Sequence, residues 1–85
     1  MDKGRRQQRK QERFPRSTGV EMKISENREV IFQGCRGVVE YREESVKLNT
    51  GRYLIAFEGR GLQIRWIDET EVVIKGFITS ISFIV

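Results

Sequence analysis

The 85-residue sequence contains no histidine, one cysteine and one proline. Without histidine the chain cannot build a Ser-His-Asp or Cys-His catalytic group, and it lacks the commonest metal ligand. A single cysteine excludes an internal disulfide. Charges interrupt every apolar run well short of the ~20 residues of a membrane span, and no apolar segment follows the basic N-terminus as in a signal peptide. These absences favour a soluble, non-enzymatic protein of a reducing compartment, without cofactor or metal.

Few side chains remain that could carry chemistry. Cys35 is followed by Arg36, and a neighbouring cation can activate a thiol, but an incidental small residue near a turn is the simpler interpretation. The carboxylates gather at residues 43–44 and 68–71, in segments of turn composition where we expect them to be solvated. The glycines at 59 and 61 lack the longer spacing and the following helix of a phosphate-binding loop.

The formal net charge of +4 is unevenly placed. Residues 17–85 contain nine basic and ten acidic residues, whereas residues 1–16 contain seven basic residues against Asp2 and Glu12, a net charge of +5. The seven are Lys3, Arg5, Arg6, Arg9, Lys10, Arg13 and Arg16. Polar composition without apolar periodicity predicts that residues 1–19 form a disordered or transiently helical arm. The arm is interpreted as a solubilising segment, an electrostatic anchor for an anionic membrane or acidic partner, or a nucleic-acid contact.

Beyond the arm, apolar and polar residues alternate in short segments separated by turn-like residues, which is typical of half-buried β-strands. No segment has helical periodicity. The sequence therefore predicts one all-β domain over residues 20–85, with seven or eight short strands in glycine-punctuated hairpin or meander units, or alternatively a short β-roll or solenoid. The predicted strands cover residues 20–24, 30–33, 38–41, 45–49, 53–58, 62–67, 71–75 and 77–84.

Three segments share one spacing of apolar residues around a glycine. Gly34, Gly59 and Gly76 each have apolar residues four and two positions before them and five and seven positions after them. The last position is aromatic each time, as Tyr41, Trp66 and Phe83. We interpret these aromatics as core residues; the alternative is a stacking platform for single-stranded nucleic acid.

The C-terminal residues 81–85 are apolar, uncharged and free of proline. Such a strand lies inside its own sheet or serves as a subunit contact. A folded part of about 65 residues is marginally stable by itself, which leaves oligomerisation as a support. The candidate interaction residues are therefore Ile81 and Phe83, together with Arg36 and the seven basic residues of the arm.

The ordered set of segments resembles the YabP/YqfC family of sporulation proteins, closer to its YqfC branch. The matching residues lie between about 28 and 84 and comprise segments 36–41, 46–50, 57–59 and 73–78, followed by Ser80, Ile81 and Phe83. The chain departs from the family pattern at Gly34-Cys35, where the family usually has an Asn-His pair.

The resemblance implies a non-enzymatic assembly module, made in the mother cell during endospore formation. It further implies a protein partner, such as a membrane-bound sporulation protein of the YqfD type, and no catalytic residues. We accordingly expect a cytoplasmic protein that self-associates or docks on a partner, with the arm touching a membrane surface. Single-stranded nucleic-acid binding through the arm and the aromatics is the alternative function.

Overall fold

A computed structural model describes residues 19–85 as a single antiparallel sheet, which confirms the all-β class. The sheet order is β2-β3-β7-β6-β5-β4, so the β2–β3 hairpin pairs with β7, the last strand of the described residues. The strands are β2 (Glu21–Ser25), β3 (Glu29–Gln33), β4 (Gly37–Arg42), β5 (Ser45–Asn49), β6 (Leu54–Ile67) and β7 (Glu71–Ile84). The predicted arm falls almost entirely outside the described residues.

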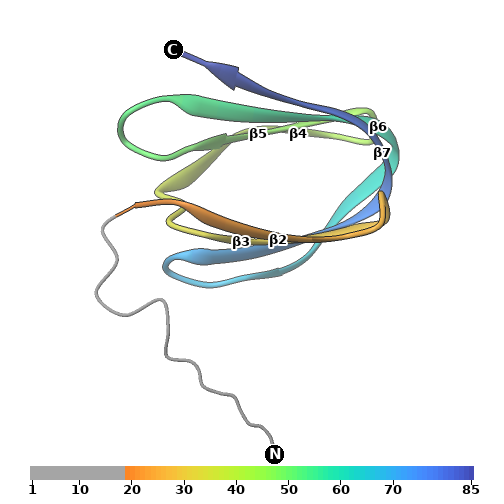
Figure 1. The fold of residues 1–85 in the computed structure, drawn as a ribbon, viewed down its shortest axis with the longest axis horizontal. Helices are drawn as coiled ribbons and strands as arrows, with labels where there is room; N and C mark the ends of the chain where they lie inside the picture. Colours follow the sequence, from red (N-terminus) through yellow and green to blue (C-terminus); the bar gives the residue numbers. More distant parts are fainter. Residues whose placement is uncertain (1–18) are drawn as a thin grey trace, which may run out of the picture.

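The sheet folds over on itself because its two central strands bend. β6 and β7 are each 14 residues long and curve sharply at one end of the molecule (Figure 1). Before its bend β6 pairs with β5, and before its bend β7 pairs with β3. One layer therefore contains β4, β5, the first half of β6 and the second half of β7, and the other contains β2, β3 and the remaining halves.

Two predicted breaks are bends within continuous strands. Segments 53–58 and 62–67 were expected as separate strands but form β6, and segments 71–75 and 77–84 form β7. Six strands replace the seven or eight predicted. Glycine occurs at both predicted positions. Because β6 and β7 stay paired across the bend, glycine permits curvature of a continuous strand there and not a reversal of the chain.

Steric contact explains why each bend requires glycine. A Cβ atom on Gly59 would overlap the carbonyl oxygen of Phe77 on the paired strand. At Gly76 the backbone has φ of 144°, and a Cβ atom would lie 2.7 Å from the carbonyl oxygen of Gly61. The backbones of β6 and β7 therefore approach more closely than side-chain-bearing residues allow.

A hairpin turn caps each bend through backbone hydrogen bonds. At the β6 bend, Gly59 N donates to Glu44 O at 3.1 Å and Leu62 N donates to Glu43 O at 2.8 Å. At the β7 bend the corresponding bonds are Gly76 N to Arg28 O at 3.1 Å and Ile78 N to Asn27 O at 2.8 Å. The two halves of the fold thus repeat one arrangement about an approximate two-fold axis between β6 and β7.

The core lies between the layers and draws on β3, β5, β6 and β7. Phe32 and Phe57, from opposite layers, meet edge to face with ring centroids 6.1 Å apart. Burial of each large side chain contributes about 1.5–3 kcal/mol relative to exposure. The fully buried side chains are Val30, Phe32, Val46, Leu48, Ile55, Phe57, Leu62, Val72 and Ile74.

The prediction that Tyr41, Trp66 and Phe83 are core residues is wrong. Trp66 and Phe83 are each 57% exposed, and Tyr41 is 52% exposed. A register shift between Ile64 and Trp66 places Trp66 opposite Val73, on the outer face of its layer. Tyr41 and Phe83 lie at opposite borders of the other layer, on β4 and β7, so the three rings do not form one platform.

Candidate interaction surface

The second half of β7 has an open edge. Residues 80–84 pair with β6 on one side, and within residues 19–85 no strand pairs with them on the other. The last backbone bond on that open side is the one from Ile78 to Asn27. An edge with unpaired N–H and C=O groups is a template for another chain. The stretch from Gly76 to Val85 contains no charged residue and no proline, and within residues 19–85 no loop or strand covers this edge beyond Ile78.

The edge at β2 is protected by its length and its charges. This strand has five residues, and within residues 19–85 it pairs only with β3 and ends the sheet. Glu21 and Lys23 are both exposed on it. Short strands with charged side chains disfavour pairing with another sheet.

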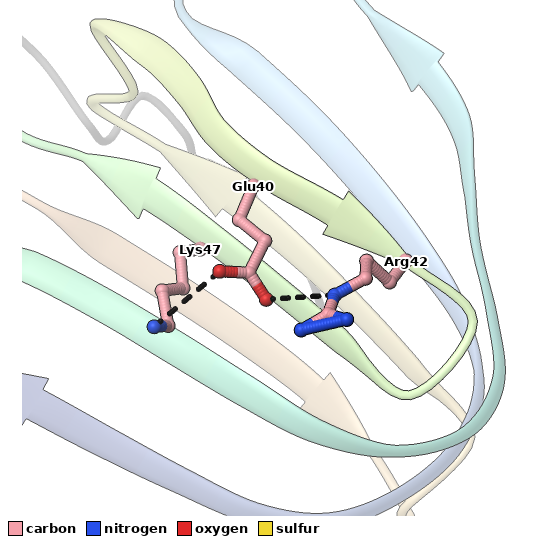
Figure 2. A network of polar contacts seen from close by, with 3 residues as sticks. All are labelled: Glu40, Arg42 and Lys47. Carbon is pink, nitrogen blue, oxygen red and sulfur yellow. Dashed lines mark hydrogen bonds and ion pairs between the residues drawn. The ribbon is translucent and has the colours of Figure 1, made fainter.

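The edge at β4 is protected by a bulge and a charge network. The register with β5 shifts between Val38 and Glu40. The Glu40 carboxylate lies 3.3 Å from Arg42 Nε and 3.5 Å from Lys47 Nζ (Figure 2). Hydrogen bonds from Ser45 and then Arg42, with the charge of Lys47, hold the pKa of Glu40 below its usual value. The carboxylate therefore stays ionised at neutral pH, and the edge carries charge.

The second half of β6 forms the remaining edge, and it is closed by a side chain of the opposite layer. The Ile64 N–H donates to Tyr41 Oη at 3.0 Å. Two register shifts, on either side of residues 63–64, also distort this edge. The approximate two-fold axis relates Ile24 of β2 to Tyr41 of β4, because Ile24 lies opposite the buried Val30 and Tyr41 lies opposite the buried Val46. Isoleucine offers no acceptor, so the β7 edge lacks this closure.

The candidate residues Ile81 and Phe83 lie on the open half of β7, on the side of the strand that faces the core. Ile81 is partly buried against the core, opposite Phe57. Phe83 lies opposite Ile55, and its exposed ring contacts Tyr53 with centroids 5.6 Å apart. The strand is thus part of its own sheet and also forms that sheet's unprotected border.

Arg36 lies away from the strand edge, at the end of the molecule opposite the bends. It is exposed and lies against Gly51, beside a pocket of about 490 Å³. Tyr53, which contacts Phe83, also lines this pocket. The arm joins the domain at Gly19, another lining residue. The basic candidates Lys3, Arg5, Arg6, Arg9, Lys10, Arg13 and Arg16 lie outside the described residues.

The structure gives the residues considered for catalysis structural surroundings. Cys35 is 5% exposed, and its Sγ donates to Gly37 O at 3.4 Å. Burial raises the pKa of this thiol, which opposes formation of the nucleophilic thiolate. Asp68 accepts backbone bonds from Glu71 at 2.9 Å and Thr70 at 3.1 Å and thereby shapes the β6–β7 turn. Over residues 19–85, no group of three His, Cys, Asp or Glu side chains is placed to hold a metal ion.

A family model described as the YabP family matches residues 16–84, which is most of the chain. The chain belongs to the YabP family. Membership indicates a sporulation-related protein of a family that is not known for enzymatic activity. The resemblance to this family is therefore confirmed, while the YqfC branch stays a prediction.

Neither the curated proteins nor the solved structures contain a significant match to this YabP-family chain. The part of the chain that the structure describes contains no helix that is long and apolar enough to cross a membrane.

Proposed function

We propose that this YabP-family protein acts in endospore formation as a non-enzymatic assembly module that binds a protein partner along the second half of β7. The observation that carries this proposal is the contrast between the four sheet edges. Three are shortened, bulged, charged or capped, and only the β7 edge is regular, uncharged and unpaired within residues 19–85. Strand addition to such an edge gives affinity through backbone hydrogen bonds and specificity through alternate side chains.

The basic arm supplies a second, weaker attraction. We place the module in the mother-cell cytoplasm, beside a membrane-bound sporulation protein, with the arm against the anionic leaflet. Each basic residue near such a surface contributes roughly 1 kcal/mol, and the attraction weakens as salt increases. Sedimentation with anionic vesicles measures this electrostatic attraction. At low salt, a larger fraction of the full chain than of a chain lacking residues 1–16 is expected to sediment with the vesicles. Equal partitioning would contradict the role of the arm.

Two lysine substitutions test the edge as the functional surface. Ser82 is exposed on the open half of β7, and Ser25 is an exposed serine on the protected β2 edge. In a strain of the source organism that lacks the native gene, Ser82→Lys is expected to lower the yield of heat-resistant spores, whereas Ser25→Lys restores it. Circular dichroism of both purified variants establishes that each is folded. Wild-type spore yield from a folded Ser82→Lys protein would refute the proposed surface.

Nucleic-acid binding is the weaker alternative. Trp66 and Tyr41 are exposed, as stacking on bases requires. However, they lie on different faces of the folded sheet, and the Tyr41 hydroxyl is engaged with the backbone of Ile64. Residues 17–85 also have a net charge of −1, with nine basic and ten acidic residues, which disfavours a phosphate-binding face.

A further inference from the structure

The approximate two-fold axis identifies which backbone N–H groups of β7 point outward on the open edge. Ile64 and Ile81 are equivalent, because they lie opposite the buried residues Ile74 and Phe57, respectively. The N–H of Ile64 points away from the β6–β7 pair, toward Tyr41. The N–H of Ile81 therefore points away from the same pair on the other side, and alternation along the strand gives Phe83 the same direction. Within the described residues, neither group has a partner on that side.

We propose that the occupant of this edge is a second copy of the chain, joined through antiparallel pairing of the two β7 strands. The inference rests on the proposed function, because it names the partner of the same edge. A two-fold interface brings one surface patch against itself, so the patch must be self-complementary. The stretch from Gly76 to Val85 meets this condition because it brings no charges together across the axis. The other three edges do not offer such a regular, uncharged stretch, because β2 is short and charged, β4 is bulged and charged, and the Ile64 N–H of β6 is bound by Tyr41.

The regular part of the edge fixes the register. The last register shift in β7 is at Thr79, and the uninterrupted stretch of residues 80–84 that follows has Ser82 at its centre. A two-fold axis at Ser82 places Ile81 opposite Phe83 of the second copy, and Phe83 opposite its Ile81. Both pairs combine outward-directed backbone groups with apolar side chains on the core-facing side of the strand. The four strands of this layer then continue into those of the second copy as one sheet.

This register makes a geometric prediction about the two Ser82 side chains. They face each other on the outer face at a pair without mutual backbone hydrogen bonds, where Cα atoms lie about 4.5 Å apart. That spacing falls within the roughly 4.4–6.8 Å that a disulfide spans. In a Cys35→Ala background, Ser82→Cys is therefore expected to form a disulfide-linked dimer on mild oxidation. Ser25→Cys in the same background is the matched control and is expected to give little disulfide-linked dimer.

Charge substitutions test the same pairing without oxidation. The unmodified chain is expected to sediment at about twice its 10.0 kDa mass, and Ser82→Lys and Ser82→Glu each at the monomer mass. Equal mixing of the two variants is expected to restore a one-to-one dimer, because opposite charges then face each other. This recovery cannot arise from misfolded proteins.

The results separate this inference from the proposed function. A monomeric unmodified chain, or equal disulfide yields from Ser82→Cys and Ser25→Cys, overturns self-pairing. If Ser82→Lys also lowers spore yield in that case, the edge binds a different protein and the proposed function stands. A dimer lost in Ser82→Lys together with normal spore yield supports self-pairing and overturns the functional role of the edge.

Discussion

Replacement of Gly59 by alanine tests the explanation of how the sheet folds over. A Cβ at this position would overlap Phe77 O and lie 2.9 Å from Phe77 C and 3.0 Å from Ile78 Cα. Ordinary contacts of a Cβ atom begin near 3.4 Å. All three obstructing atoms belong to backbone, so rotation of a side chain cannot relieve the overlap. The strands β6 and β7 must separate at the bend, directly over the buried Leu62 and Ile78.

The expected loss of stability is a large part of the total. Overpacking that side chains can absorb costs about 1–3 kcal/mol, and a backbone obstruction places Gly59→Ala at about 3 kcal/mol or more. A domain of this size has a free energy of unfolding of about 3–10 kcal/mol at roughly 0.05–0.15 kcal/mol per residue. Urea unfolding followed by far-UV circular dichroism measures the difference, because the exposed Trp66 gives only a weak fluorescence change.

Gly37→Ala is the matched control for this measurement. Gly37 also lies in a strand, but no atom lies within 4 Å of a Cβ placed there. The same substitution is therefore expected to change stability by less than about 1 kcal/mol, and to raise it if the main effect is on the unfolded chain. If Gly59→Ala were as stable as Gly37→Ala, the close approach of β6 and β7 would not be what glycine provides at this bend.

Two further substitutions test the edge closure and the β6–β7 turn. Tyr41→Phe removes the acceptor for Ile64 N–H, so the free energy of unfolding is expected to fall by about 0.5–1.5 kcal/mol. Hydrogen exchange at the Ile64 amide is expected to accelerate. Exchange at this amide that is the same in Tyr41→Phe as in a Tyr53→Phe control would count against the closure. Hydrogen bonds from the N–H groups of Glu71 and Thr70 hold the pKa of Asp68 below its ordinary value. The ionised carboxylate therefore stabilises the fold fully at pH values above the unfolded-state pKa. This stabilisation is lost as pH falls through the lower folded-state pKa. Urea unfolding at a series of pH values is therefore expected to show a constant gap between wild type and Asp68→Ala from neutral pH down to about 4 that narrows at lower pH; a gap that does not narrow would contradict this role.

Local sequence patterns predicted the parts of the fold that depend on neighbouring residues. Alternation identified the strands. Glycine marked the positions of both bends, although strand breaks were expected there, because backbone approach at Gly59 and Gly76 excludes any side chain. The pairing of β3 with β7 joins residues distant in sequence, and no local pattern encodes it. Trp66 was misplaced because a register shift exchanges the faces of a strand without altering the apolar spacing.

The candidate surface was predicted only in part. The apolar, uncharged residues 81–85 indicated the C-terminal strand as a possible contact, and the structure shows that its edge is open within residues 19–85. The sequence could not show that the other three edges are closed. The bond from Ile64 to Tyr41 joins opposite layers, and the shift at Val39 appears only in the register with β5.

The pairing of the β2–β3 hairpin with β7 also determines when the domain can fold during its synthesis. Val30 lies opposite Ile74, so β3 has no neighbour on that side until β7 has left the ribosome. Until then the β2–β3 hairpin presents Val30 and Phe32 to water, and a hairpin alone is at best marginally stable. Neither layer can be finished before the other, because both need β7. Folding of residues 19–85 therefore waits until β7 is translated, because the pairing of β7 with both β3 and β6 joins the two layers.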